Sequence, residues 1–227
     1  MKTQAIIPTA GVGQRLKAPT IKPLVLLHGK PIFIRTLEVF EKSLFIDSVI
    51  LAAPKDYFQE FEKAIKEYHL HKVVRIVAGG VKRCDSVRNA LQIIDKDTEV
   101  VVVHDGVRPL VTEEIIEQSV KLCEAHEAVV TAVPMKPTIK KVSRQDFIVE
   151  KTIRRDDLWE VQTPQTFRRD TLWEAYEMAK TQDPTDDAML VEALGVPVKI
   201  LEGDYTNIKI TTAEDLTIAE SFLNSRS

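Results

Sequence analysis

The sequence of 227 residues predicts an α/β protein with a doubly wound, mostly parallel sheet. Short apolar runs rich in β-branched residues alternate with longer segments of helical period, which is the order of βαβ units. Runs such as 100–103 are apolar at every position, as expected of strands that are covered on both faces. Five of the eight glycines, 11, 13, 79, 80 and 106, follow a strand-like run, which places them at the edge where α/β sheets bind ligands.

The predicted elements follow one another along the chain. The expected strands are 4–8, 48–53, 72–77, 99–104 and 128–134, and the expected helices between them are 32–42, 57–68, 86–94 and 113–125. Thr112 has the residue type of an N-cap for the last of these helices. Farther on, we expect helices at 170–180 and 186–194, strands at 196–201 and 207–211, and a closing helix from Ala213. Parallel pairing then brings the loops after residues 8, 77 and 104 to one edge of the sheet.

The segment 136–160 interrupts this order. Apolar and charged residues alternate there without a helical period, which predicts a hairpin of 138–142 paired with 147–153. Because an isolated hairpin is barely stable in water, we expect this one to pack against something else, such as another subunit. We therefore expect one domain over 1–227, with 136–160 as a β-arm within it.

The composition narrows the possible partners. Hydrophobic residues make up 44% of the chain, charged residues make up 29%, and the net charge is −3, as in ordinary soluble globular proteins. This balance gives no general reason to expect nucleic-acid or membrane binding, and the apolar runs are too short to span a bilayer. Met1 leads into the first strand without the pattern of a targeting peptide. The isolated Cys84 and Cys123 favour reduced thiols and a cytoplasmic location.

The loop after the first strand is the first candidate for ligand binding. Its sequence Gly-Val-Gly-Gln-Arg-Leu begins like a dinucleotide-binding fingerprint, but Leu16 occupies the position of the third glycine, which argues against a redox dinucleotide enzyme. Arg15 and Lys22 lie in a stretch, 8–24, that contains no acidic residue. The loop can therefore be a glycine-rich turn that binds phosphate, or a solvated surface turn.

Two other loops carry candidate residues. Asp105 follows the apolar run 100–103, which is predicted to be a buried strand, and this position suits a Mg²⁺ ligand that shares the ion with substrate phosphates. Arg108 could then bind another phosphate through its planar guanidinium, although the same residues would also suit a simple turn. The pair Gly79-Gly80 before Ser86 could let the backbone approach a flat nucleobase, or could mark only a turn and a helix N-cap.

Several mechanisms are disfavoured by missing motifs. The histidines at 28, 69, 71, 104 and 126 form no His-Glu-x-x-His pattern, and the chain has no Gly-x-Ser-x-Gly nucleophile motif. A phosphate monoester needs no general base to act as a nucleophile, because it is largely dianionic near pH 7. Cations, one Asp at a strand end and no evident base therefore favour the attack of one phosphate on another.

The chain resembles a known family over essentially its whole length. The resemblance rests on eight ordered segments: AGVGQRL, IKPLVLLHGKPI, GGVKRCDSV, VVVHDGVRP, KPTIKKV, RRDDLWEVQTPQTF, TDDAMLVEALG and NIKITTAEDL. These segments are similar to those of the 2-C-methyl-D-erythritol 4-phosphate cytidylyltransferases of the non-mevalonate isoprenoid pathway. The chain departs from many members at Ile21 and Pro23 around the loop lysine, at Val81 and at Thr206.

The resemblance implies a Rossmann-like nucleotidyltransferase core and a homodimer in which each arm completes the partner's site. It implies that CTP and 2-C-methyl-D-erythritol 4-phosphate (MEP) react, with Mg²⁺, to give the cytidine diphosphate derivative and pyrophosphate. Carried over by position, the catalytic residues would be Arg15, Lys22 and Asp105, with Asp105 also the metal ligand. The nucleotide would be bound by Ala10, Gly11, Gly80 and Ser86, and the sugar phosphate by Arg108, Thr138, Arg155, Thr185 and Lys209.

Two alternatives stay open from the sequence. The acceptor could be another alditol phosphate, with ribitol 5-phosphate the obvious candidate, although the segment DDLWEVQTPQTF is more similar to the methylerythritol enzymes. The chain could also be a nucleotide-binding regulator without catalytic activity. The presence of both Lys22 and Asp105 argues against that second alternative.

Overall fold

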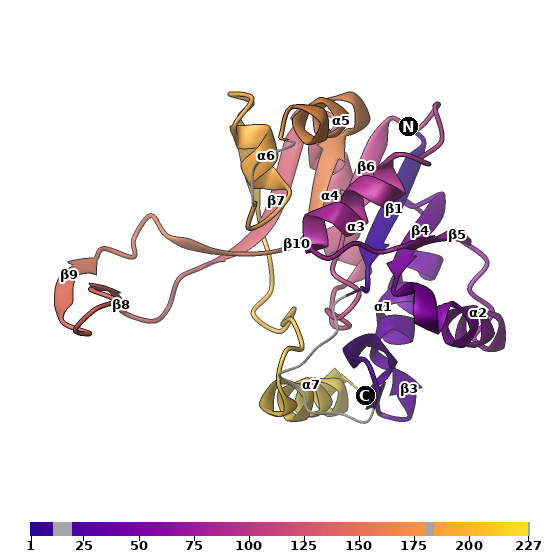
Figure 1. Ribbon diagram of the computed structural model, residues 1–227, viewed down its shortest axis with the longest axis horizontal. Coiled ribbons are helices and arrows are strands. Elements are labelled where there is room, and N and C mark those ends of the chain that lie inside the picture. Colours follow the sequence, from indigo (N-terminus) through magenta and orange to yellow (C-terminus); the bar gives the residue numbers. More distant parts are fainter. Residues whose placement is uncertain (11–19, 180–183, 227) are drawn as a thin grey trace.

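The computed structural model describes residues 1–10, 20–179 and 184–226 of the chain. A seven-stranded sheet forms its centre, in the order β11-β7-β10-β6-β1-β4-β5 (Figure 1). These strands are β1 (Thr3–Pro8), β4 (Ser48–Ala53), β5 (Val73–Ala78), β6 (Val100–Val103), β7 (Ala128–Pro134), β10 (Trp159–Arg168) and β11 (Val198–Glu202). All neighbouring pairs are parallel except those that involve β10, which runs antiparallel to both β6 and β7.

The strand order reverses at β1. From β1 the chain proceeds to β4 and then to β5 on one side, and it returns to place β6 on the other side of β1. Ligands of open α/β sheets bind at such a reversal, beyond the carboxyl ends of the strands. The loops that follow β1 and β6 are therefore the expected walls of a ligand site.

Helices cover both faces of the sheet. One core cluster contains buried residues of α1 (Ile32–Lys42), α2 (Phe58–Glu67) and α4 (Glu113–Leu122), and the other contains those of α3 (Arg83–Leu91), α5 (Arg169–Met178) and α6 (Ala188–Glu192). Adjacent strand residues alternate between the two clusters, so that Ala5 packs in the first and Ile6 in the second. This alternation explains why runs such as Val100–Val103 are apolar at every position. No helix of the described residues is both long and apolar enough to cross a membrane.

The last helix, α7 (Ala213–Arg226), packs in a third, smaller core cluster beyond the carboxyl ends of the strands. Its Ala219 is buried there with Leu27, Ile32, Val107 and Ile210. Short elements lead into this region: the 3₁₀ helix η2 (Lys22–Leu24) and the two-stranded pair β2 (Leu26–Leu27) and β3 (Lys30–Pro31). A further 3₁₀ helix, η3 (Lys55–Tyr57), precedes α2.

Most predicted elements are confirmed, and the doubly wound, mostly parallel architecture with them. The bounds of β4, β7 and α1 match the predictions, and Thr112 caps α4 by accepting a hydrogen bond from the Ile115 amide at 3.2 Å. Two predictions were wrong, and one strand was missed. The helix expected from Ser86 begins at Arg83, the segment 207–211 forms no strand, and the central strand β10 was not predicted at all.

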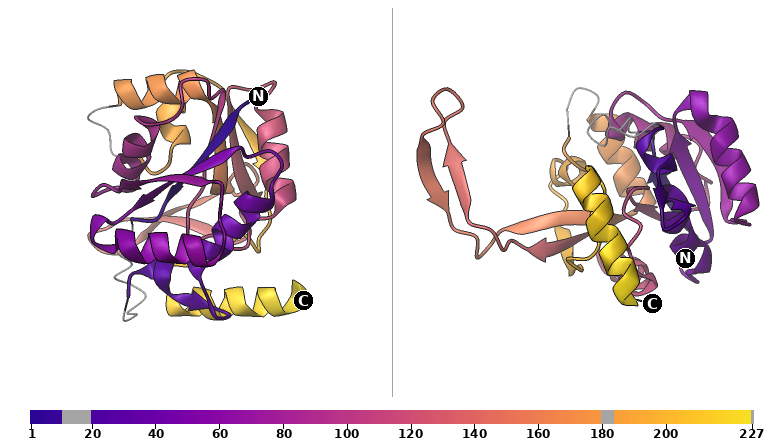
Figure 2. Two further views of the ribbon diagram at one scale, coloured as in Figure 1. Left: turned by 90° about the vertical axis from the view of Figure 1, so that its right-hand side faces the viewer. Right: turned by 90° about the horizontal axis from the view of Figure 1, so that it is seen from below.

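The predicted hairpin is present, as β8 (Ile139–Val142) paired antiparallel with β9 (Val149–Ile153). It stands away from the central sheet on an extension of β7 and β10 (Figure 2). Phe147, Ile148 and Val149 at its tip are exposed by 82%, 62% and 52%. Apolar side chains this exposed on a projecting hairpin favour contact with another protein surface.

The buried His104 fixes the loop that follows β6. Its Nε2 lies 3.2 Å from the Arg108 carbonyl oxygen, and its Nδ1 lies 3.0 Å from the Thr163 hydroxyl. A carbonyl oxygen can only accept a hydrogen bond, so the neutral ring carries its proton on Nε2 and accepts from Thr163 at Nδ1. Thr163 in turn accepts the Asp105 amide at 3.0 Å. These bonds hold both ends of the segment 104–108.

Burial lowers the pKa of His104 from its usual 6.5 to about 4. As the pH falls, the unfolded chain binds this proton before the folded protein does, so the stability that neutral His104 provides at pH 7 is lost between pH 6.5 and 4. From this residue we expect a loss of about 2 kcal/mol in unfolding free energy between pH 7 and pH 5. Urea unfolding at the two pH values measures that loss, and His104→Asn should reduce it.

His71→Asn is the matched control, because His71 is exposed. This variant should keep the pH dependence of the unmodified protein. An equal loss of stability in the His104→Asn variant and the unmodified protein would contradict the role given to the buried ring.

Candidate active site

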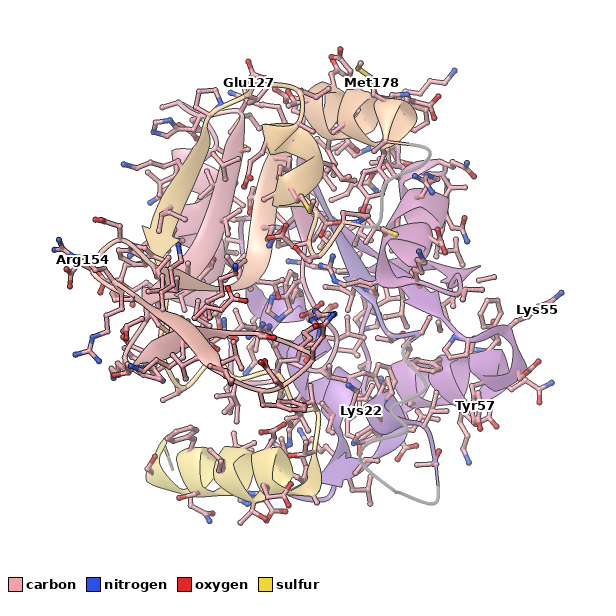
Figure 3. The ribbon with its side chains drawn as sticks, turned by 60° about the vertical axis from the view of Figure 1, so that its left-hand side comes forward. Lys22, Lys55, Tyr57, Glu127, Arg154 and Met178 are labelled. Atoms are coloured by element: carbon pink, nitrogen blue, oxygen red, sulfur yellow. The ribbon has the colours of Figure 1, made fainter. Side chains whose placement is uncertain are left out.

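A cavity of about 450 Å³ opens at the carboxyl ends of the strands, where the strand order reverses. Its described lining residues are Pro8, Thr9, Ala10, Lys22, Pro23, Gly80, Val81, Lys82, Arg83, Ser86, Asp105, Val107 and Lys209. Four of these side chains are cationic and one is a carboxylate. Lys22 lies at the opposite end of the sheet from Glu127, which precedes β7 (Figure 3). The charge balance suits a polyanionic ligand.

A second cavity of about 220 Å³ shares Arg83, Asp105 and Lys209 with the first. The other described residues that line it are Arg108, Val161, Gln162, Thr163, Gln165, Thr185 and Asp186. The shared residues therefore form a wall between two spaces, each large enough for part of a ligand. Two ligands that bind in the two cavities would meet at Asp105.

Asp105 is the electrostatic centre of this wall. Its Oδ1 accepts a hydrogen bond from Arg83 Nε at 2.9 Å, and its Oδ2 lies 3.3 Å from Arg108 Nε and 3.0 Å from Lys209 Nζ. Burial would by itself raise the pKa of this carboxyl group, but Arg83, Lys209 and Arg108 hold the pKa well below its usual value. Asp105 is therefore a carboxylate at neutral pH.

The loop after β5 is shaped by close contacts within the protein. A Cβ atom on Gly79 would overlap the Ala10 side chain, and one on Gly80 would overlap Asp85. The glycine pair is thus required by the approach of this loop to the chain after β1 and to the first turn of α3. Ser86, which is 1% exposed, completes the turn by accepting the Gly80 amide at 3.0 Å.

Lys22 is presented by a short, well-anchored element. It is the first residue of η2, whose Pro23 and preceding Ile21 are buried. Pro23 fixes the backbone after the lysine and suits the first turn of a helix, where its missing N–H group is not needed. The half-buried Lys22 side chain reaches the first cavity from there.

The segment that carries Lys209 is held without belonging to a strand. The Ile210 amide donates to the Val107 carbonyl at 2.9 Å, and Arg108 Nη1 donates to the Asn207 carbonyl at 2.8 Å. The buried Asn207 side chain also donates to the Thr163 carbonyl at 2.9 Å. This segment, the loop after β6 and strand β10 thus position one another.

The structure brings together most of the residues expected at the site. Those that line the first cavity are Ala10, Lys22, Gly80, Ser86, Asp105 and Lys209, and those that line the second are Asp105, Arg108, Thr185 and Lys209. Thr138 and Arg155 belong to the exposed arm and line neither cavity within this chain. Gly11 and Arg15 lie outside the described residues.

Sequence reasoning missed Arg83 and the polar residues of β10. Arg83 contacts Asp105 and the buried Asp187, with Nη1 2.6 Å from Asp187 Oδ2. Gln165 accepts the amides of Asp187 and Ala188 at 3.1 Å and so fixes the turn that precedes α6. The cluster of uncharged polar residues in the stretch Gln162–Thr166 was the available signal, since buried polar groups in a strand need specific partners.

A divalent cation fits this site in only one way. The described residues contain no group of three or more His, Cys, Asp or Glu side chains that could hold a metal ion. Among the described lining residues of the first cavity, Asp105 alone offers a carboxylate. Mg²⁺ commonly binds through one or two carboxylates, water and substrate phosphates, so Asp105 could hold the ion only together with a phosphorylated ligand.

Comparison with known proteins identifies the family of the chain. The model of the family described as IspD, 2-C-methyl-D-erythritol 4-phosphate cytidylyltransferase, matches residues 3–225. Relatives of that name from Alkaliphilus oremlandii and Geobacter metallireducens are 45% and 42% identical, over 99% and 100% of this chain and 96% and 99% of theirs.

Solved structures are similar as well. That of 4-diphosphocytidyl-2C-methyl-D-erythritol synthase from Anaerococcus prevotii is 32% identical, with a TM-score of 0.86 over 98% of this chain and 96% of its own. The cytidylyltransferase from Francisella tularensis is 31% identical, with a TM-score of 0.82 over 97% and 99%. The chain therefore belongs to the 2-C-methyl-D-erythritol 4-phosphate cytidylyltransferase family.

Proposed function

We propose that this protein transfers a cytidylyl group from CTP to MEP, giving 4-diphosphocytidyl-2-C-methyl-D-erythritol and pyrophosphate. The observation that carries the proposal is the pair of adjoining cavities that share Asp105, Lys209 and Arg83. Two phosphorylated substrates must meet for the MEP phosphate to attack the CTP α-phosphate. Family membership supports the identities of these substrates.

The first cavity is the proposed nucleotide site. Ala10, Gly80 and Ser86 line it together with Lys22, and Gly11 and Arg15 complete the proposed set from outside the described residues. Lys22 and Arg15 would hold the triphosphate and stabilise the negative charge that develops as the α-phosphorus becomes pentavalent. Transfer between phosphates depends mainly on such positioning and electrostatic stabilisation.

The second cavity is the proposed site for the sugar phosphate. Arg108, Thr185 and Lys209 line it, and two of them are cations that can bind a phosphate dianion. A phosphate bound there would approach the nucleotide past Asp105, which lines both cavities. No general base is required, because the attacking phosphate is already largely ionised near pH 7.

We propose Mg²⁺ as the metal, with Asp105 as its protein ligand. When bound with the triphosphate, the ion would neutralise phosphate charge and favour departure of pyrophosphate. The burial of Asp105, the one carboxylate among the described residues that line the first cavity, supports this assignment.

We propose that 1–227 is one domain whose arm, 136–160, joins two copies as a homodimer. Thr138 and Arg155 would then complete the sugar-phosphate site of the partner subunit. The exposed apolar tip of the hairpin supports this proposal. Arg155 donates a hydrogen bond to the Lys136 carbonyl. This bond joins the two segments of the same chain that lead into and out of the arm. The buried free thiols of Cys84 and Cys123 agree with the proposed cytoplasmic location.

Pyrophosphate release tests this function. With CTP, MEP and Mg²⁺ we expect turnover, which EDTA abolishes and added Mg²⁺ restores. Ribitol 5-phosphate, assayed in parallel, should react at a much lower kcat/KM. Faster reaction with ribitol 5-phosphate would reassign the acceptor, and CTP binding without pyrophosphate release from either acceptor would indicate a regulator.

Lys22→Ala should lower kcat by about 10²–10³, as expected when one preorganised donor to a developing charge is removed. Steady-state pyrophosphate release measures this change. Lys55→Ala is the control, because Lys55 is exposed in η3, far from Lys22 (Figure 3). Near-normal turnover of the Lys22→Ala variant would refute the proposed stabilisation by this lysine.

Mixing of inactive variants tests the role of the arm. If Arg155 serves the partner's site, a hybrid dimer of an Arg155→Ala subunit with a Lys22→Ala subunit regains one intact site. Activity should therefore rise after subunit exchange, to about half that of the unmodified dimer in each hybrid. No recovery after exchange has been verified by mass spectrometry would place Arg155 and Lys22 in the same subunit's site.

A further inference from the structure

Asp187 is a buried carboxylate that lines neither cavity. It directly precedes α6 and is 0% exposed. Its Oδ1 accepts a hydrogen bond from the Tyr176 hydroxyl, and its Oδ2 accepts one from Arg83 Nη1 at 2.6 Å. Because burial of a carboxylate costs several kcal/mol unless it is well paired, these two donors are what allows a charge at this position.

Arg83 is held from two sides by carboxylates. Its Nη1 donates to Asp187 and its Nε donates to Oδ1 of Asp105 at 2.9 Å. The guanidinium group is planar and rigid, so binding at two of its nitrogens fixes its position. Arg83 is thereby a bridge from a carboxylate behind the site to the carboxylate in its centre.

The other two cations on Asp105 are held differently. Arg108 and Lys209 both contact Oδ2, at 3.3 Å and 3.0 Å, whereas Oδ1 is bonded to Arg83. The Lys209 side chain is 37% exposed and has a flexible stem, and Arg108 also donates to a backbone carbonyl. Neither contact to Oδ2 is backed by a second buried carboxylate among the described residues.

We infer that Asp187, supported by Tyr176, is a positioning residue for the reaction. It keeps Arg83 on Oδ1 of Asp105, so that Oδ2 is the oxygen whose cationic partners exchange when ligands bind. The inference rests on the proposed function, because it concerns the work of Asp105 in that reaction. Without the charge of Asp187, Arg83 can leave Asp105 for a ligand phosphate, and the carboxylate loses its fixed orientation.

Asp187→Asn removes the negative charge and keeps the shape of the side chain. The amide oxygen can still accept from Arg83, and the amide nitrogen can donate to the Tyr176 oxygen. The variant should lower kcat about 10- to 100-fold, the usual effect of removing a group that orients a metal ligand or its partner. The KM for CTP should change less than kcat does, because Asp187 itself does not line the nucleotide cavity.

Asp47→Asn is the matched control. The Asp47 carboxylate accepts the Thr3 amide at 2.6 Å, next to the amino end of β1 and far from the cavities. This variant should lower the thermal midpoint and leave kcat unchanged within about twofold. A loss of kcat in the control equal to that in Asp187→Asn would show that general destabilisation is sufficient.

A double variant tests whether Asp187 acts through Arg83. Arg83→Gln leaves Asp187 as a buried charge without its arginine, so adding Asp187→Asn should raise the thermal midpoint above that of Arg83→Gln alone. The kcat of the double variant should equal that of Arg83→Gln within about twofold. Multiplied losses in kcat, or an Asp187→Asn variant with kcat within about twofold of the unmodified protein, would overturn the inference.

The two hypotheses can fail separately. Turnover of the unmodified protein tests the proposed function, whereas the ratio of variant to unmodified kcat tests the positioning role. If the unmodified protein does not turn over, the proposed function fails. The thermal midpoints of Arg83→Gln and of the double variant then still test whether Asp187 is paired with Arg83. A double variant less stable than Arg83→Gln would refute that pairing.

Discussion

The site depends on one buried carboxylate, Asp105, which three cations neutralise from three parts of the chain. A buried carboxylate left alone would cost several kcal/mol. Its pairing with Arg83, Arg108 and Lys209 therefore ties the start of α3, the loop after β6 and the segment before α7 to one point. The same contacts separate the two cavities, so the interaction that stabilises the loops also creates a meeting point for two ligands.

The sheet makes this arrangement possible because its order reverses beside β6. The fully buried run Val100–Val103 delivers Asp105 to the end of the sheet, and the neutral His104 holds the following turn through Arg108 and Thr163. An imidazolium at this position would place another positive charge in a region already rich in cations. Burial lowers the pKa of His104 to about 4. The ring therefore stays neutral at pH 7, adds no positive charge to the site and keeps the hydrogen bonds that hold the loop.

The sequence was sufficient to predict the bounds of elements with a clear apolar pattern, such as β4, β7 and α1. It failed at β10 because that strand is exposed at Trp159 and Val161 and buries polar side chains such as Gln165 and Thr166. At 207–211, Ile208 and Ile210 alternate with Lys209 as in a strand. The backbone there makes isolated hydrogen bonds to loops, however, and not the regular series of hydrogen bonds that joins neighbouring strands. In both places the residue types follow the needs of the candidate site, and the apolar periodicity that reveals strands is therefore absent or misleading.

Arg83 shows why the site could be predicted only in part. Residues of types that bind phosphate or metal stand out in the sequence, whereas Arg83 is significant only because Asp105 and Asp187, 22 and 104 positions away, surround it. Among the described residues, the cations Arg83, Arg108 and Lys209 surround the carboxylate of Asp105, and only Arg83 is shared with a second carboxylate, that of Asp187. A ligand phosphate that drew both Lys209 and Arg108 away from Oδ2 would leave Asp105 with Arg83 as its remaining partner among these cations. A metal ion that arrived with the triphosphate could then pair with Asp105, so a single carboxylate could suffice for its binding.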